Sequence, residues 1–224
     1  MFIKLSYCID SKTPVYGGGE GFFSEPLKSI KKGDTCNTSK WTIPSHLGTH
    51  IDFPHHFFNK CQTVEDFALD FWFFKKNKIQ FLEAKLSDNE HIIKPDDIKI
   101  SRYSSNAELI ILKTGFGKFR KLDKYWKFNP GVSIELTDWI KKKFKKIKIF
   151  GIDSISISSY QSRKIGRIVH KKLLDFKNPI LIVEDMNLSQ VSEHTIFNKI
   201  WIFPLMVKGM DASPCTIFAD VKIC

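Results

Sequence analysis

Short apolar runs separated by polar and turn-forming residues dominate the chain, and this pattern predicts a sheet-rich protein. The runs are rich in isoleucine, leucine, valine and phenylalanine, which fit the pleated surface of a buried strand. Three glycines follow Tyr16 and indicate a turn after the first run. We therefore expect strands at residues 2–9, 79–84, 108–112, 147–152, 180–183, 199–206 and 216–221.

Two segments show helical signals. Residues 133–146 begin with Ser133, a good helix N-cap, carry Glu135 in the first turn and end in lysines. Residues 167–176 also look helical and stop before an Asn-Pro pair. Strands therefore alternate with helices, which predicts an α/β fold with one mixed central sheet flanked by helices. Because no linker-like stretch interrupts the chain, we expect a single domain over residues 1–224.

Charge gives a weaker signal than hydrophobic pattern. The net charge is +11, but lysine supplies nearly all of the positive side chains. Arginine, which binds phosphates and bases in a bidentate manner, is scarce. We therefore favour a lysine-coated surface and expect no nucleic-acid partner. A basic nucleic-acid-binding module, using the lysines at 141–146, is the remote alternative. The four arginines are Arg102, Arg120, Arg163 and Arg167.

Cysteine use and hydropathy indicate the compartment. The five cysteines form no C-x-x-C pair, and a chain of this size needs no disulfide framework, so reduced thiols are expected. No apolar run approaches the roughly 18–20 residues of a membrane span. These observations predict a cytoplasmic protein that does not contact a membrane. The cysteines are Cys8, Cys36, Cys61, Cys215 and Cys224.

The segment PSHLGTHIDFPHHF holds four of the seven histidines and is the most informative for chemistry. His46 and His50 would share a face of a helix, but Gly48 and Pro54 disfavour that helix. In an extended chain His50 and Asp52 project to the same side, and a turn at Gly48 can return His46 to them. Two imidazoles and a carboxylate suit zinc or manganese and leave a coordination position open for water, which is typical of catalytic sites.

The two histidines after Pro54 are candidates for proton transfer. A histidine near activated water can act as general base and then as general acid, because its pKa lies near neutrality. We favour His56 for this role, with His55 as its competitor. Adjacent residues of an extended chain point in opposite directions, so only one of the two is expected to face the metal.

Further candidate residues lie later in the chain. His170 belongs to the second predicted helix, and Glu184 follows a short apolar strand, where sites of α/β sheets gather. Asp185 offers a second carboxylate, and the sequence does not decide between the two. Asp153 and Ser154 follow another strand, where they fit the rim of a site or a turn stabilised by their own side chains equally well.

Residues 46–57 resemble the H-x-G-T-H-x-D-x-P-x-H-F signature of the cyclase-like metal hydrolases, a family that includes bacterial kynurenine formamidases and isatin hydrolase. Three later segments, at 151–156, 170–188 and 204–214, also resemble segments of that family. The resemblance implies an α/β fold with a barrel-like centre and a site for one or two divalent ions, Zn²⁺ or Mn²⁺.

The resemblance also implies the ligand set. His46, His50 and Asp52 match the ligands of the first ion. Asp52, His170 and Glu184 match those of the second ion, with Asp52 as the bridging carboxylate.

Other expectations from the resemblance concern catalysis, substrate and assembly. His56 matches the catalytic acid–base histidine. Tyr16 stands near the place where the formamidases carry a tryptophan that lines the aromatic substrate, so it is the candidate substrate-binding residue. Phe22 and Phe23 are weaker candidates for the same aromatic wall. The family also implies a homodimer or larger homo-oligomer.

The expected activity is metal-dependent hydrolysis of a carbon–nitrogen bond in a small aromatic or cyclic amide, with N-formylkynurenine as the best single substrate. The alternative is a cyclase or dehydratase that acts on another small carbonyl compound with the same metal site. Both readings assign a small-molecule substrate.

Overall fold

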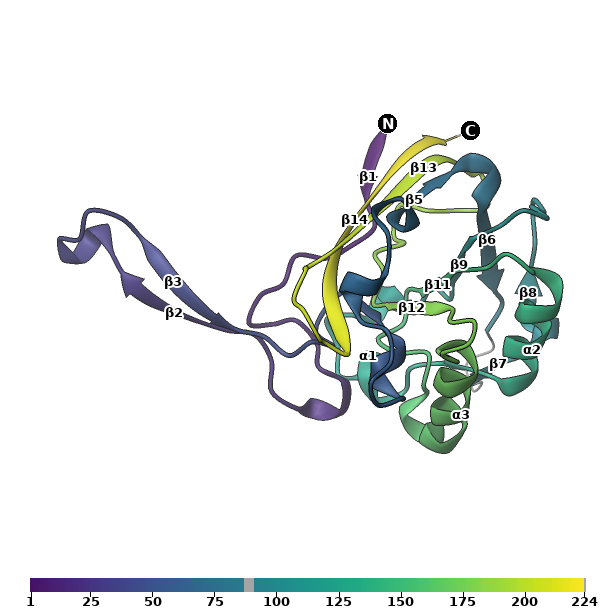
Figure 1. The fold of residues 1–224 in the computed structure, drawn as a ribbon, viewed down its shortest axis with the longest axis horizontal. Helices are drawn as coiled ribbons and strands as arrows, with labels where there is room; N and C mark the ends of the chain where they lie inside the picture. The colour runs from purple at the N-terminus through teal and green to yellow at the C-terminus, as the bar shows by residue number, and fades with distance from the viewer. Residues whose placement is uncertain (87–90, 224) are drawn as a thin grey trace.

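A ten-stranded mixed sheet organises the computed structural model, which describes residues 1–86 and 91–223 (Figure 1). The expected α/β class with one mixed central sheet is confirmed. Along the sheet the strands are β5 (Phe73–Lys75), β13 (Thr195–Pro204), β14 (Ala212–Ile223), β4 (His50–Asp52), β12 (Leu181–Glu184), β11 (Ile149–Ile152), β9 (Leu109–Lys113), β6 (Ile79–Ala84) and β8 (Ile98–Lys99), while β1 (Phe2–Lys4) pairs with β14.

The middle of the sheet is parallel and buried on both faces. Strands β12, β11, β9 and β6 run parallel to one another, and Ile149 pairs with both Leu109 and Leu181. Residues 109–112 are all apolar and at most 1% exposed. A strand covered on both faces needs such a continuous apolar run, which is why these strands were visible in the sequence.

Strand β14 connects the two halves of the sheet. Its first residues pair with β4, and the rest pairs with β13 and β1. Strand β4 therefore lies between β14 and β12, antiparallel to both. This arrangement puts His50 directly opposite Glu184 on one side and Pro214 on the other.

Two longer helices pack on the sheet, α2 (Ile134–Lys143) and α3 (Arg163–Leu173). The helix α1 (Lys124–Lys127) is a single turn. Ser133 caps α2 as expected, because its hydroxyl accepts a hydrogen bond from the Leu136 N–H at 3.0 Å. The buried sides of α2 and α3 belong to the same apolar core as the strands. A short parallel pair, β7 (Ile92–Ile93) and β10 (Gly131–Val132), leads into α2.

A hairpin of β2 (Phe23–Lys28) and β3 (Thr38–Thr42) extends away from the body of the molecule (Figure 1). We call residues 22–42 the arm. Every residue of its two strands is exposed or half-buried. The arm was not expected from the sequence, because two strands that bury no core face lack the apolar run that marks the others.

Several expected boundaries were wrong, each for a local reason. The first strand ends at Lys4, not at residue 9. Beyond Lys4 the Ile217 N–H donates to the Ser6 hydroxyl instead of to a backbone carbonyl, so the ladder of backbone hydrogen bonds stops. Helix α3 covers residues 163–173 rather than 167–176 and ends as Ile180 N–H bonds to the carbonyl of Leu173. Strands β13 and β14 begin four residues earlier than expected.

Short 3₁₀ segments connect several of these elements. They cover Tyr16–Gly18, Ile30–Lys32, Pro54–His56, Val64–Asp66, Leu69–Trp72, Lys76–Lys78, Pro95–Asp97, Phe116–Phe119 and Tyr160–Ser162.

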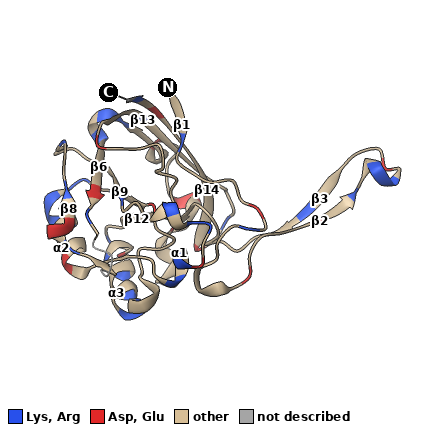
Figure 2. Ribbon diagram, turned by 180° about the vertical axis from the view of Figure 1, so that it is seen from behind, with Lys and Arg blue, Asp and Glu red and all other residues tan. Residues whose placement is uncertain are grey.

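Basic side chains and free cysteines are distributed over several elements of the fold. Figure 2 shows lysine and arginine spread over the arm, α2, α3 and other elements. Within residues 1–86 and 91–223, no helix has the length and apolar character to cross a bilayer. Cys8, Cys36, Cys61 and Cys215 are free thiols, and Cys224 lies outside the described residues.

Candidate metal centre

The histidine-rich segment turns sharply and then enters the sheet. Gly48 adopts φ +67°, a left-handed conformation that side chains rarely adopt, and a Cβ there would lie 3.0 Å from the Ile9 side chain. After this turn, β4 carries His50 and Asp52 on one face and buries Ile51 on the other. The extended interpretation of the segment is therefore confirmed, and the helical alternative for His46 and His50 is wrong.

The predicted ligand atoms converge at one place. Asp52 Oδ1 lies 3.0 Å from His46 Nδ1 and 3.4 Å from His50 Nε2, and its other oxygen lies 3.6 Å from His170 Nε2. Glu184 is 3.5 Å from both His50 Nε2 and His170 Nε2. Strand β4 with the turn before it, strand β12 and helix α3 thus bring together five residues that lie between positions 46 and 184. The two sides of the Asp52 carboxylate face different histidines.

Backbone carbonyls fix the imidazole tautomers. His50 Nδ1 is 2.9 Å from the Gly48 carbonyl, and His170 Nδ1 is 2.8 Å from the Gly166 carbonyl. A carbonyl only accepts, so both Nδ1 atoms carry hydrogen and donate. When these imidazoles are neutral, their Nε2 atoms carry lone pairs directed at the carboxylates, which is the arrangement found in metal-ligating histidines.

Electrostatics of the cluster favour a cation. Burial opposes ionisation of Asp52, but the imidazoles of His46 and His50 outweigh it and hold the pKa of Asp52 well below its usual range. Burial also opposes ionisation of Glu184, yet the neighbouring imidazoles of His170 and His50 lower its pKa to about 2. Asp52 and Asp211 raise the pKa of His46 to about 9 despite its burial. Two buried anions thus attract positive charge, and protons and a metal ion would compete for it.

The cluster passes a test of fit for a metal ion. His50 Nε2 and both oxygens of Asp52 are buried without a hydrogen-bond partner, although each lies near opposite charge. Unpartnered buried polar groups are costly, and an ion bound between them would relieve that cost. Tetrahedral ligands about 2.0–2.1 Å from an ion lie about 3.3–3.4 Å from one another. The separations of 3.4–3.6 Å around His50 and His170 match that spacing.

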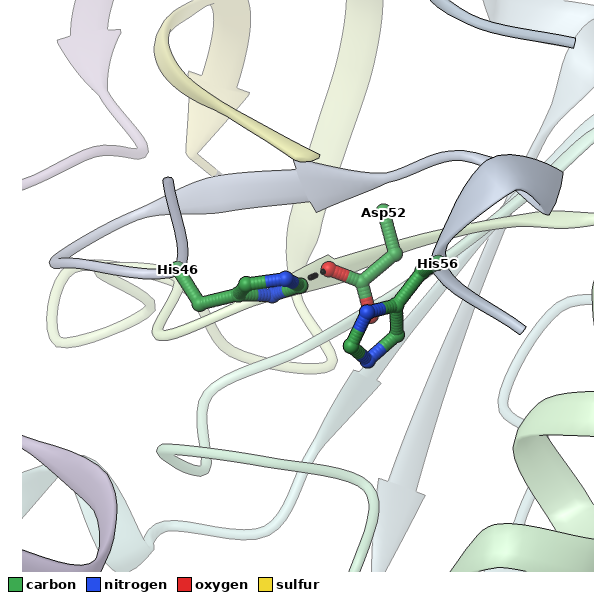
Figure 3. Close-up of side chains that lie close together, drawn as sticks. All are labelled: His46, Asp52 and His56. Atoms are coloured by element: carbon green, nitrogen blue, oxygen red, sulfur yellow. Dashed lines mark ion pairs between the residues drawn. The ribbon is translucent and has the colours of Figure 1, made fainter. Parts of the chain in front are cut away.

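His56 lies beside this cluster. Its ring centre is 4.2 Å from that of His46, and Figure 3 shows both rings directed toward the Asp52 carboxylate. His56 Nδ1 is 3.2 Å from Asp211 Oδ2, and His46 Nε2 is 2.8 Å from the same oxygen. Residues 54–56 form a 3₁₀ turn rather than the extended chain we expected. The expectation that one histidine faces the site still holds, because His56 lines the cavity and His55 does not.

Asp211 also belongs to the site, although the sequence did not single it out. It contacts His46 and His56, and hydrogen bonds from both hold its pKa well below its usual range. Its backbone carbonyl also accepts from the Phe53 N–H, which anchors the segment after β4. The signal was present, since Asp211 belongs to the 204–214 segment that carries part of the family resemblance.

The structure decides between Glu184 and Asp185. Glu184 faces the cluster and accepts hydrogen bonds from the Ser156 hydroxyl at 2.9 Å and the Ile157 N–H at 2.7 Å. Asp185 adopts φ +52° and points the other way, where Arg120 holds both of its oxygens at 2.7–3.0 Å. The Tyr125 hydroxyl donates to Asp185 at 2.6 Å.

Two contacts outside the ligand cluster hold β4 and α3 in position. The Asp185 carbonyl accepts from the Thr49 hydroxyl at 2.6 Å, next to His50. On α3, Gly166 lies so close to the loop before the helix that a Cβ would be 1.7 Å from Ser158 Oγ. Asp153 accepts from Thr114 and from the Gly115 N–H, so it stabilises a turn and does not face the cluster.

A cavity of about 370 Å³ opens over the cluster. Tyr16 lines it, as predicted, and burial raises the pKa of Tyr16 to about 12. Arg163 and Arg167 line it as well, although we had not assigned them to a site. Phe22 and Phe23 do not line this cavity, because they lie at the base of the outward-pointing arm.

Comparison with known proteins gives the relatives of this chain. A family model described as "Putative cyclase" matches residues 3–159. An uncharacterized protein of Methanocaldococcus jannaschii is 29% identical over 192 residues, covering 84% of this chain and 86% of that protein. Kynurenine formamidase of Bacillus anthracis is 24% identical over 213 residues, covering 95% and 94%.

Solved structures share the fold. Isatin hydrolase A from Labrenzia aggregata, bound to benzyl benzoate, superposes with a TM-score of 0.79 at 16% identity, covering 100% of this chain and 94% of that one. A potential metal-dependent hydrolase with cyclase activity gives a TM-score of 0.70 at 20% identity, covering 98% and 96%.

Proposed function

This chain belongs to the putative cyclase family, and on that premise we propose that it is a metal-dependent hydrolase of a carbon–nitrogen bond in a small aromatic or cyclic amide. The observation that carries the proposal is the set of buried, unpartnered ligand atoms of His50 and Asp52 beneath an open cavity. The names of the kynurenine formamidase relatives support an aryl formamide, and N-formylkynurenine is the substrate we propose.

His46, His50, Asp52, His170 and Glu184 would hold one or two divalent ions, with Zn²⁺ favoured over Mn²⁺ by the imidazole ligands. Such an ion would polarise the amide carbonyl and lower the pKa of water toward neutrality.

His56 performs the proton transfers in this proposal. Asp211 accepts from its Nδ1 and orients the ring, which leaves Nε2 for the proton. Nε2 takes the proton of the attacking water as the carbon–oxygen bond forms. It then delivers this proton to the leaving nitrogen as the carbon–nitrogen bond breaks, so amide and water become carboxylic acid and amine.

Metal analysis combined with an amide assay tests the proposal. Protein purified without added metal should contain at least about one zinc or manganese per chain. Formanilide should be hydrolysed to aniline, a chelator should abolish the reaction, and added metal should restore it. Turnover that survives complete removal of metal would refute the proposal.

The family description gives a second candidate. A cyclase or dehydratase would use the same site on a different carbonyl compound, as the family's description suggests. A metal-loaded protein that cyclises or dehydrates such a compound, but leaves formanilide, N-formylkynurenine and isatin unchanged, would favour it.

We further propose a homodimer in which the arm contacts a second copy of the chain. The arm exposes four large apolar side chains to solvent, and such exposed apolar surface is typical of sites that contact another protein. They are Phe23, Leu27, Ile30 and Trp41, which are 58–68% exposed. A two-stranded hairpin without a third strand or a helix to pack on is marginally stable in water. A partner surface would supply that packing.

A further inference from the structure

A second cavity, of about 640 Å³, opens where the two ends of the large sheet approach each other. Strands β5 and β13 form one side, and β6 with the loop after β8 forms the other. Among the described residues, none lines both this cavity and the one over the histidine cluster. Figure 1 shows β5, β13 and β6 near the two chain ends, on the far side of the molecule from α3, which carries His170. A ligand of this cavity would therefore be separate from the candidate metal centre.

Two lysines face each other at the edge of this cavity. Lys75 of β5 and Lys199 of β13 are directly opposite in the antiparallel pair, so their side chains lie on the same face. Both line the cavity and are exposed. Like charges in this position destabilise a strand pair. An anion between the two ammonium groups would replace that repulsion with attraction.

The surrounding carboxylates do not neutralise this charge. Across residues 1–86 and 91–223, no carboxylate forms an ion pair with either lysine, nor with Lys76 and Arg102, which also line the cavity. Of the described lining residues, Glu193 alone is acidic, and it already pairs with Lys99 at 2.5 Å and accepts from the Ser101 hydroxyl at 3.1 Å. The cavity therefore presents four cations and one carboxylate that is already paired.

A buried amide fixes the loop that carries one of these cations. Gln80 on β6 is 1% exposed, and its amide nitrogen donates to the Arg102 carbonyl at 2.7 Å. Its oxygen accepts from the Ser104 N–H at 2.8 Å. Tyr103 lies between these two contacts and adds a ring to the cavity wall. Because the backbone of the loop is already held, less conformational entropy is lost when a ligand binds.

The deeper part of the cavity is apolar. Ile79 and Phe197 are 7% and 5% exposed, and Phe81 is half-buried. The ring centres of Phe81 and Phe197 lie 6.3 Å apart, between β6 and β13. An apolar interior beneath exposed cations suits a ligand with one apolar end and one anionic end.

We propose that this cavity binds a small phosphate monoester that carries a ring, with the phosphate between Lys75 and Lys199 and the ring against Phe81 and Phe197. A phosphate monoester carries about −1.5 to −2 charges at pH 7, so it matches both lysines, whereas a carboxylate matches only one. Lysine binds phosphate as a point charge and needs no bidentate geometry. Aryl phosphates and nucleotides share this chemistry, and the cavity has the volume of a small-molecule site.

Calorimetric titration with phenyl phosphate, inorganic phosphate and phenol tests whether both ends of the ligand contribute. Phenyl phosphate should bind at least about tenfold more tightly than either fragment. Tighter binding of AMP than of phenyl phosphate would assign a nucleotide, and the reverse order would assign an aryl phosphate. Inorganic phosphate that binds as tightly as phenyl phosphate would overturn the inference. So would a single-stranded oligonucleotide that binds more tightly than both, because it would assign a nucleic-acid surface.

Variants of the two opposed lysines locate the binding. Lys75→Gln/Lys199→Gln should weaken phenyl phosphate binding by about 10–100-fold. The control Lys142→Gln/Lys145→Gln removes the same charge from exposed positions outside the cavity, and its affinity should stay within about twofold of the parent protein. Parent-like affinity in the first variant would contradict the assigned position of the phosphate.

Melting without ligand shows whether the first variant is folded and whether the lysines repel each other. Lys75→Gln/Lys199→Gln should melt no lower than the parent protein, because the substitution removes a repulsion between the strands. A lower melting temperature would show that the two lysines stabilise the strand pair, which is contrary to the argument for an anion between them.

The histidine cluster needs its own control, because phosphate also binds divalent ions. His50→Ala removes a proposed metal ligand and leaves the lining of the second cavity intact. This variant should bind phenyl phosphate as tightly as the parent protein. Loss of binding in it would assign the phosphate to the histidine cluster and overturn the inference. Since no measurement here needs turnover, the outcome is independent of the proposed hydrolase activity.

Discussion

Replacing Arg120 by methionine should destabilise the protein by leaving a carboxylate buried without its cation. The Asp185 side chain is 2% exposed, and Arg120 contacts both of its oxygens at 2.7–3.0 Å. Breaking a buried pair by removing one partner costs about 3–5 kcal/mol. The Tyr125 hydroxyl still donates to Asp185, so we expect the lower end, about 3 kcal/mol.

Urea unfolding and thermal melting measure this loss. For a chain of this size, about 3 kcal/mol corresponds to a melting temperature lower by about 6–12 °C. The double variant Arg120→Met/Asp185→Asn removes both charges, and asparagine tolerates the φ of +52° at position 185. It should be more stable than the single variant by at least about 1 kcal/mol. A single variant as stable as the parent protein, or a double variant no better than the single one, would refute the reasoning.

The remaining predictions concern the metal, the proton transfer, the helix contact and the arm. His50→Ala should remove bound metal and abolish turnover, and full metal occupancy by elemental analysis would contradict its role as a ligand. His56→Ala should keep the metal and lose about 10²–10⁴-fold in kcat, while His55→Ala should lose far less; the reverse order would exchange their roles. Gly166→Ala forces α3 away from the loop it contacts, so the free energy of unfolding in urea should fall by about 1–3 kcal/mol, and an unchanged value would show that the loop gives way freely. Trp41→Ser should shift a dimer toward monomer in light scattering, whereas a parent protein that is monomeric at micromolar concentration would refute the arm contact.

Local patterns made part of the fold and part of the candidate site predictable. The strand β6 was expected at the residues it occupies, and Ser133 caps α2 as its position suggested. His50 and Asp52 lie two residues apart, so strand periodicity alone puts them on one face. Such features depend on near neighbours in the chain, and a sequence displays those directly.

The features that escaped prediction depend on distant contacts or on the absence of a core. Asp211 meets His56 across 155 positions, and no local pattern announces that contact. Arg163 was overlooked because α3 was expected to begin at residue 167, which left it outside the helix that carries it to the cavity. The arm lacks a buried face, so hydrophobic periodicity could not reveal it.

Strand β14 is the last strand to leave the ribosome, yet it pairs with β4, which is made much earlier. The cluster needs Pro214 paired beside His50 and Asp211 bonded to His46 and His56. The histidine-rich segment therefore leaves the exit tunnel long before the residues that complete its surroundings. The surroundings of the proposed metal site are therefore complete only once β14 has joined the sheet.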